Sequence, residues 1–348
     1  MPICRNVEAL AGYVPGEQPK ESGIIKLNTN ENPYPPSPLV GEALRNFDYR
    51  KLRLYSDPVY AACRQRIAEI NGCRPENVFV GNGSDEVLAL FTRAFVETPD
   101  GTIGFFDPTY SLYSVLADIR DCQKRAIPLP DDFSWVAPPS DFEASAFLLT
   151  NPNAPTSVQY PHEEVRAFCR RFPGIVLIDE AYADFAETNC MDIATDPENA
   201  NTLVMRTLSK SYSLAGLRFG YCVGPERLID ALFKIKDSYN MDWFSQTLGL
   251  AALNDLPAMR ANVRKILATR SRMTDALRKR GWKVLDSQTN FLFAAPPCDA
   301  RTLFEHLKAN KIFVRYFPGP RTGNFLRITM GTDDQMDRFL AVIDDCAP

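Results

Sequence analysis

The sequence predicts an α/β protein in which a large domain, with a mainly parallel sheet sandwiched by helices, precedes a smaller α+β domain. Two observations indicate the large domain. From about residue 78 onward, short apolar runs alternate with helical patterns, as in chains of right-handed β–α–β crossovers. The run 175–178 is apolar at every position, which is typical of a strand buried on both faces. The pattern changes after about residue 225, and this change indicates the smaller domain.

The large domain is expected to contain six strands with helices between them. Each predicted strand is a short apolar run, and several of these runs end at polar loops. We expect strands at 78–80, 102–106, 146–150, 175–178, 202–205 and 219–223, and helices at about 85–95, 110–119 and 163–171.

The smaller domain is expected to follow a long helix at about 257–280. Apolar residues recur along this helix at helical spacing, Pro257 lies at its start and Gly281 directly after its end. Strands are then expected at 282–285, 291–294, 312–316 and 324–329, with one helix between the second and third strands and a last helix to about residue 345.

Residues 1–38 are expected to form an extended N-terminal arm that packs near the small domain. The segment 32–38 contains four prolines, which fix φ and remove backbone donors, so it is predicted to be neither helix nor central strand. The expected division is therefore an arm at 1–38, a large cofactor-binding domain at 39–255 and a small C-terminal domain at 256–348, with the boundary at the long helix.

Composition excludes several classes of function. The formal net charge is −4 without a basic run, so we expect no nucleic-acid partner. No apolar run approaches the roughly 20 residues that span a bilayer, and no apolar signal segment begins the chain, so we expect no membrane partner. The nine cysteines include no CxxC pair, and the two histidines, His162 and His306, lie far apart. We therefore expect reduced thiols in a cytoplasmic protein and no metal site.

Two polar loops after predicted strands offer binding groups. Residues 81–86 open a helix, whose unpaired N–H groups can hold a phosphate or be capped by Ser84 or Asp85. Asp179 ends the most apolar strand, where ligands bind in open α/β sheets. A helix cap or a loop salt bridge is the alternative role for Asp179.

Two further loops supply an amine and amide groups. Lys210 lies among small and hydroxylic residues, eight positions before Arg218, and a desolvated lysine near a cation suits Schiff-base chemistry. A surface lysine in a polar loop is the alternative. The loop 149–156 adds Asn side chains in a turn. If the four loops converge at one sheet edge, they provide the parts that hold pyridoxal phosphate.

The chain resembles the fold-type I pyridoxal-phosphate enzymes, and within them the histidinol-phosphate aminotransferase group of class II aminotransferases, whose members serve histidine biosynthesis. The resemblance is carried by an ordered set of motifs that runs over most of the chain. The motifs lie at 27–33, 54–58, 81–86, 108–113, 151–156, 179–182, 207–218 and 326–329.

This resemblance implies a role for each candidate residue of the cofactor site. Lys210 is the Schiff-base lysine, Asp179 pairs with the protonated pyridine nitrogen, and Tyr182 donates to the ring O3′. The resemblance further assigns Tyr110 to the ring face, and Ser84, Asp85, Ser209 and Arg218 to the phosphate. Tyr55 matches a residue that reaches the phosphate from a second subunit, which implies a homodimer with shared sites.

One departure concerns the second O3′ donor. The family loop usually reads Asn-Asn-Pro-Thr-Gly, but here Ala154 stands where the donor is often placed and Ser157 replaces the glycine. Asn153 is therefore the candidate donor from this loop.

The resemblance also implies a phosphorylated amino donor and a 2-oxo acid as partner substrates. Tyr13, Asn30, Arg315 and Arg327 are the candidate substrate-binding residues, and Arg315 is expected to end its strand. Arg321 is either an extra phosphate contact or a solvated loop charge, and the loop charge is favoured. The reaction expected is ping-pong transamination between histidinol phosphate and 2-oxoglutarate. Alternatives are an aromatic amino acid aminotransferase, a threonine-phosphate decarboxylase and a non-catalytic binding module, and Lys210 with Asp179 argues against the last.

Overall fold

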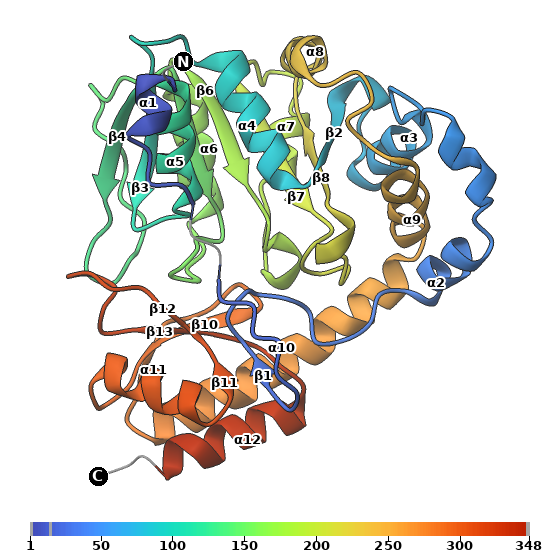
Figure 1. Ribbon diagram of the computed structural model, residues 1–348. Helices are drawn as coiled ribbons and strands as arrows, with labels where there is room; N and C mark the ends of the chain where they lie inside the picture. The colour runs from blue at the N-terminus through green and yellow to red at the C-terminus, as the bar shows by residue number, and fades with distance from the viewer. Residues whose placement is uncertain (1–2, 14–15, 346–348) are drawn as a thin grey trace.

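The computed structural model describes residues 3–13 and 16–345, and its largest element is a seven-stranded sheet (Figure 1). The four pairings from β7 to the edge strand β4 are parallel, whereas β8 runs antiparallel to both of its neighbours. In spatial order the strands are β2 (Val78–Asn82), β8 (Phe219–Val223), β7 (Thr202–Thr207), β6 (Ile175–Asp179), β5 (Ala146–Thr150), β3 (Thr102–Asp107) and β4 (Gln123–Pro128).

All six strands expected in this part of the chain are present, and the expected mainly parallel sheet is confirmed. Strand β4 was not predicted. It lies at the edge of the sheet and exposes most of its residues, Lys124 and Arg125 among them, so it carries no apolar run.

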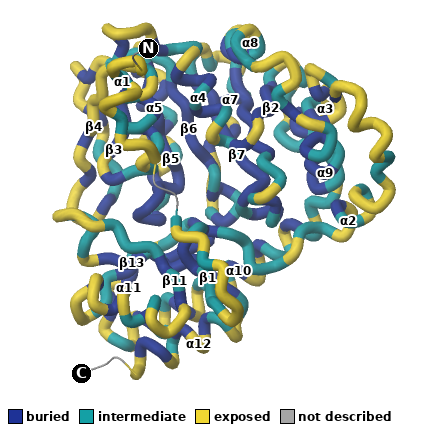
Figure 2. Tube along the Cα trace, viewed as in Figure 1, coloured by how far each residue is buried: buried dark blue, intermediate teal, exposed yellow. Residues whose placement is uncertain are grey.

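Helices cover both faces of this sheet, as expected for parallel strands. One face packs against α4 (Ser84–Phe95), α5 (Leu112–Arg120) and α8 (Glu226–Ile235). The other packs against α3 (Ala61–Asn71), α6 (His162–Arg171) and α7 (Met191–Thr195). Figure 2 shows most of the strands as a buried layer between the helices, with β4 exposed at the edge.

The C-terminal part contains a second, antiparallel sheet with the order β12-β13-β10-β9. The helix α10 (Leu256–Lys279) leads into it from the large sheet (Figure 1). The other elements are β9 (Lys283–Val284), β10 (Phe291–Ala295), α11 (Ala300–Ala309), β11 (Ile312–Phe313), β12 (Arg315–Tyr316), β13 (Leu326–Thr329) and α12 (Asp333–Asp344).

The single strand expected at 312–316 is two strands in the structure. Strand β11 pairs in parallel with β1 (Ile25–Lys26) of the arm, and β12 pairs with β13. Arg315 therefore begins β12 instead of ending the preceding strand, because the chain changes partner at Val314. This change places Arg315 directly opposite Arg327.

The N-terminal arm contacts a helix beside the large sheet and strand β11 in the C-terminal part. Its short helix α1 (Arg5–Glu8) lies beside α5, where Asn6 Nδ2 donates to the Ile119 carbonyl at 3.1 Å. Its proline-rich segment is extended as expected, except that Pro38 begins α2 (Pro38–Arg45), where a missing N–H costs nothing. The remaining helical elements are η1 (Tyr49–Arg53), η2 (Pro75–Asn77), η3 (Ala183–Phe185), η4 (Ala215–Leu217) and α9 (Trp243–Leu253).

None of the described helices combines the length and the hydropathy that are needed to cross a bilayer.

Gly104 in β3 tests how tightly the large sheet packs. A Cβ at Gly104 would lie 2.7 Å from Phe147 Cδ2 and 2.9 Å from Phe142 Cε1, so Gly104→Ala forces two buried rings to move. We expect Gly104→Ala to lower the free energy of unfolding by about 1–3 kcal/mol in urea denaturation. Gly216→Ala, whose added Cβ meets no atom within 4 Å, is the control. Equal stabilities of the two variants would contradict this packing.

Candidate active site

The carboxyl ends of β5, β6 and β7 open into a cavity of about 450 Å³ between the two sheets. The parallel register sets Thr150 beside Asp179 and Asp179 beside Met205, so the loops that follow these strands leave the sheet together. The cavity is lined by most of the residues predicted from the sequence, namely Tyr13, Asn30, Ser84, Asp85, Tyr110, Asp179, Tyr182, Ser209, Lys210, Arg218, Arg315 and Arg327.

Lys210 carries the only lysine amine that lines this cavity among the described residues. Its Nζ donates to the Thr29 carbonyl at 3.4 Å and lies 5.9 Å from the centre of the Tyr182 ring. Burial, followed by the positive charge of Arg327, lowers the pKa of Lys210 to about 8. The lowered pKa leaves more of this amine neutral near pH 7 than in an ordinary lysine, and the neutral amine can act as a nucleophile and a base.

Asp179 presents a carboxylate to the same cavity from the end of β6. Its Oδ2 accepts from Tyr113 Oη at 2.8 Å and its Oδ1 accepts from the Ala181 N–H at 3.1 Å. Burial raises the pKa of Asp179 to about 6, although both hydrogen bonds oppose the shift. Among the described residues no cation forms a salt bridge with Asp179, so a cationic ligand atom would stabilise it.

The turn before α4 forms a cradle for an anion. Gly83 has φ +82°, and a Cβ there would lie 2.4 Å from Arg218 Nη2. The guanidinium of Arg218 also pairs with Asp85 at 3.1 Å. A helix N-terminus with a guanidinium and the nearby hydroxyl of Ser209 suits a phosphate group.

A pair of guanidinium groups faces this cradle from the small sheet. Arg315 and Arg327 are opposite each other in the register of β12 and β13, and both line the cavity. Arg327 Nη2 donates to the Asn28 carbonyl at 2.9 Å, whereas its buried Nε has no hydrogen-bond partner among the described residues. Burial lowers the pKa of Arg327. A buried guanidinium with an unmet donor indicates a site for a second anion.

Aromatic side chains and residues of the arm line the cavity wall between the cradle at Arg218 and the pair Arg315 and Arg327. Tyr13 packs edge-on against Tyr110, with ring centroids 5.9 Å apart. Asn30 Nδ2 donates to Tyr182 Oη at 2.8 Å, so the hydroxyl proton of Tyr182 remains available for a ligand. Burial raises the pKa of Tyr182, which keeps that proton in place.

Two of the predicted cofactor residues do not line the cavity. The Asn153 amide donates to the Pro108 carbonyl at 3.1 Å and to Thr156 Oγ1 at 2.9 Å, so its donors are used within the turn and Ala154 faces the cavity instead. The side chain of Tyr55 is 77% exposed and stacks on Tyr239, away from this chain's own cavity.

Arg321 does not line the cavity, and its guanidinium donates to backbone carbonyls of the large domain. Its Nη1 donates to the Asp107 carbonyl at 2.6 Å and its Nη2 donates to the Pro130 carbonyl at 3.0 Å. These bonds join the loop between β12 and β13 to the large sheet, and this contact between distant segments carried no signal in the sequence.

Sequence reasoning also missed several residues that line the cavity. They carry hydroxyl, amide or aromatic groups from loops whose motifs gave no role to them individually. These residues are Gln18, Thr29, Thr109, Ser111, Thr150, Thr207 and Phe317.

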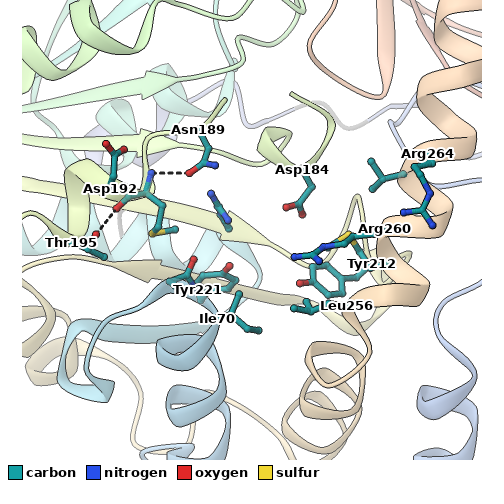
Figure 3. A pocket seen from close by; sticks show the side chains of 15 residues that line it. Ile70, Asp184, Asn189, Asp192, Thr195, Tyr212, Tyr221, Leu256, Arg260 and Arg264 are labelled. Atoms are coloured by element: carbon teal, nitrogen blue, oxygen red, sulfur yellow. Dashed lines mark hydrogen bonds between the residues drawn. The ribbon is translucent and has the colours of Figure 1, made fainter. Parts of the chain in front are cut away.

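A larger cavity of about 580 Å³ lies behind the loop that carries Lys210 (Figure 3). Asp184, Tyr212 and Arg260 lie around it, and Asp184 accepts a hydrogen bond from Ser211 in that loop. It mixes acidic and basic side chains and contains none of the residues predicted from the sequence. The smaller cavity is therefore the candidate active site, because it is lined by the lysine, the carboxylate and the three arginines.

The chain matches the family model of class I and II aminotransferases over residues 22–343. It is 39% identical over 346 residues to a histidinol-phosphate aminotransferase of Rippkaea orientalis, covering 99% of this chain and 98% of the relative. Identity to histidinol-phosphate aminotransferase 1 of a Nostoc species is 41% over 345 residues, with coverages of 98% and 96%. The crystal structure of histidinol-phosphate aminotransferase from Sinorhizobium meliloti in complex with pyridoxal-5'-phosphate superposes with a TM-score of 0.89 at 25% identity, covering 99% and 98%.

The lowered pKa of Lys210 can be tested in the ligand-free chain. Reductive methylation modifies only neutral amines, so its rate at Lys210 should rise with a midpoint near pH 8, measured by mass spectrometry of the Lys210 peptide. Arg327→Gln removes the largest charge that lowers this pKa, and we expect it to raise the midpoint. The exposed Lys279 is the internal reference. A Lys210 midpoint equal to that of Lys279, or one unmoved in Arg327→Gln, would show that the cavity does not activate this amine.

Proposed function

Because the chain belongs to the class I and II aminotransferases, it is a pyridoxal-phosphate-dependent aminotransferase, and we propose that it interconverts histidinol phosphate and imidazole-acetol phosphate with 2-oxoglutarate and glutamate. The choice of donor rests on one observation: the guanidinium pair Arg315 and Arg327 faces the cradle at Ser84 across one cavity. One anion site holds the phosphate of the cofactor, and the other is then available for the phosphate of the donor.

The residues of the cavity fit the cofactor. Bound pyridoxal phosphate supplies an electron sink for negative charge at the substrate Cα. Asp179, buried without a salt-bridge partner among the described residues, provides the counter-charge for the pyridine nitrogen. Gly83 leaves room for the guanidinium of Arg218 beside the phosphate, together with Ser84, Asp85 and Ser209.

Lys210 has two tasks in this proposal. Its neutral amine would hold the cofactor, and as a free amine it would act as the base that takes the proton from the substrate Cα. Tyr182 donates to the ring O3′ with the proton that Asn30 leaves free. Tyr182 takes this role alone, because the Asn153 amide is used within its own turn, and Tyr110 covers the ring face.

The two half-reactions use one substrate site in turn, which makes the kinetics ping-pong. Histidinol phosphate presents a phosphate to Arg315 and Arg327, and glutamate presents a carboxylate to the same guanidinium groups. Tyr13 and Asn30 border this site from the arm.

An aromatic amino acid is the second candidate donor. Phe317 lines the cavity, and the Arg327 guanidinium lies 5.2 Å from its ring centre, so an aromatic side chain finds an apolar surface there. An aromatic amino acid carries a single carboxylate, however, and two opposed guanidinium groups offer more positive charge than it needs. A threonine-phosphate decarboxylase would also need a phosphate site, and it is distinguished by release of carbon dioxide.

A homodimer with shared sites explains the position of Tyr55. The stacked rings of Tyr55 and Tyr239 have centroids 4.3 Å apart and are 77% and 44% exposed. Further large apolar side chains are exposed around them in the segment 39–59, namely Leu39, Leu44, Tyr49, Leu52, Leu54 and Val59. A patch of exposed apolar side chains often marks a protein–protein contact. In a dimer it would be covered, and Tyr55 would reach the phosphate cradle of the second copy.

The remaining proposals concern organisation and location. The three units are the arm at 1–38, the large domain at 39–255 and the small domain at 256–348, the last two joined by α10. The buried cysteines Cys63, Cys169, Cys190 and Cys222 are free thiols, which accords with a reducing compartment such as the cytoplasm.

Arg315→Ala tests the donor. Loss of a charge-assisted contact to a buried anion costs about 1.5–3 kcal/mol, so kcat/KM for histidinol phosphate should fall tenfold or more. Turnover of phenylalanine should fall much less, since phenylalanine carries no phosphate. Arg301→Ala on the exposed face of α11 is the control. Equal losses for both donors, or a wild-type preference for phenylalanine, would identify an aromatic aminotransferase instead.

Subunit mixing tests the shared site. Tyr55→Phe and Lys210→Ala are each expected to be nearly inactive. In a mixed dimer, one site combines the intact Lys210 of one chain with the intact Tyr55 of the other, so random exchange should restore about a quarter of wild-type activity. Exchange is verified separately with differently tagged chains. Absence of restored activity after proven exchange would mean that Tyr55 does not serve the second subunit.

A further inference from the structure

A buried hydroxyl lies directly behind the carboxylate of Asp179. Tyr113 in α5 is fully buried, and its Oη is 2.8 Å from Asp179 Oδ2 and 2.6 Å from Thr150 Oγ1. Tyr113 does not line the cavity, so it cannot touch a bound ligand there. Neither the sequence motifs nor the proposed mechanism gives this hydroxyl a role.

The direction of these hydrogen bonds follows from the number of protons. An ionised carboxylate only accepts, so the single hydroxyl proton of Tyr113 goes to Asp179. The contact between Tyr113 and Thr150 must then use the proton of Thr150. Thr109 Oγ1 lies 3.3 Å from Thr150 Oγ1 and 3.3 Å from Asn153 Oδ1, and it donates to one of them. The chain of hydroxyl groups is therefore polarised toward Asp179, provided that Asp179 is charged.

The two oxygens of Asp179 are held from different elements. The Ala181 N–H, in the loop after β6, holds Oδ1, and Tyr113, from α5, holds Oδ2. With both oxygens fixed, the plane of the carboxylate is fixed relative to the cavity that Asp179 lines. Without the Tyr113 hydroxyl, Oδ2 would have no hydrogen-bond donor among the described residues.

We propose that Tyr113 is a positioning residue that holds Asp179 as an oriented carboxylate facing the pyridine nitrogen of the cofactor. The proposal rests on the proposed role of Asp179 as counter-charge to that nitrogen. Thr150 supports Tyr113 from the end of the neighbouring strand β5, so two strands and one helix fix a single charge.

The balance of forces at Asp179 explains why this hydrogen bond matters. Burial raises the pKa of Asp179 to about 6, the charge of Asp85 from α4 raises it further, and Lys210 lowers it. The hydrogen bond from Tyr113 is the first contribution that opposes burial. Removing it should therefore move the pKa of Asp179 up toward neutral pH, where the neutral acid could no longer balance a pyridinium charge.

The ring of Tyr113 is held independently of its hydroxyl. It packs edge-on against Tyr110 with centroids 5.7 Å apart and lies 6.4 Å from the Phe105 ring. Tyr113→Phe keeps these contacts and removes one oxygen. Tyr160→Phe is a matched control, because Tyr160 is equally buried but its hydroxyl has no hydrogen-bond partner among the described residues.

The experiment measures the affinity of the cofactor-free full chain for pyridoxamine 5′-phosphate by calorimetry across pH. This probe forms no covalent bond with Lys210, and its own titration cancels in the ratio of variant to wild-type dissociation constants. With a pKa raised by about one unit, Tyr113→Phe should bind within threefold of wild type at about pH 8 and about tenfold more weakly by about pH 5. Tyr160→Phe should follow wild type throughout.

Asp179→Asn separates this proposal from the one on which it rests. Asp179→Asn lacks the charge at every pH, whereas wild type loses it as the pH falls through about 6. The loss of affinity in Asp179→Asn relative to wild type should therefore be largest at high pH and shrink as the pH falls. A penalty for Asp179→Asn that does not change with pH would overturn both roles. If that penalty shrinks as expected while Tyr113→Phe matches Tyr160→Phe, Asp179 keeps its role and the role of Tyr113 is overturned.

Thr150→Val provides a second variant in case Tyr113→Phe does not fold. It keeps the Tyr113 hydroxyl but removes the proton that Thr150 donates to it. We expect the same pH-dependent weakening as in Tyr113→Phe, but smaller. A ratio to wild type that stays constant with pH would overturn the polarised hydroxyl chain and the role of Tyr113 with it.

Discussion

The carboxylate of Asp179 is a charge at the end of a buried strand, and the free-energy cost of burying it explains much of the site. A carboxylate without water or a cation is unstable, and the pKa of Asp179 rises accordingly. The amine of Lys210 and the guanidinium of Arg327 suffer the same burial, and their pKa values fall. The ligand-free cavity therefore contains three charges that the protein itself does not fully stabilise. A ligand with a cationic ring nitrogen and anionic phosphate groups stabilises all of them at once. The same electrostatic arrangement therefore accounts for both ligand binding and the reactivity of the site.

The parts of this arrangement that the sequence predicted are those fixed by local pattern and parallel register. An apolar run without alternation identified β6, and a polar residue at its end marked the ligand edge. Since β5, β6 and β7 are parallel neighbours, the loops that follow them had to meet, and Lys210 and Asp179 came together as expected. The cradle at Ser84 belongs to β2, which lies further along the same sheet. For such residues, sequence order and strand direction suffice.

The parts that escaped prediction depend on contacts between distant segments or on side-chain orientation within a turn. Strand β1 is two residues long and exists only because β11, nearly three hundred residues later, pairs with it. Asn153 lies in the predicted loop, but its amide is used by the Pro108 carbonyl. Tyr113 lies in a predicted helix, and nothing in a helical pattern indicates that one buried hydroxyl meets a carboxylate from another strand.

The arm sets the geometry between the two anion sites. Asn30 adopts φ 57°, a left-handed conformation that asparagine tolerates better than most residues. In that conformation its Oδ1 accepts from Thr329 Oγ1 at 3.0 Å in the small sheet, while its Nδ2 donates to Tyr182 Oη at 2.8 Å in the large part. The Asn290 amide also donates to its carbonyl at 3.0 Å. Thr329 follows Arg327 on the same strand, and Tyr182 follows Asp179 in the same loop. One asparagine side chain thus links the strand that carries Arg327 to the loop that carries Tyr182, so the arm as well as the arginines sets the length of ligand that fits between them.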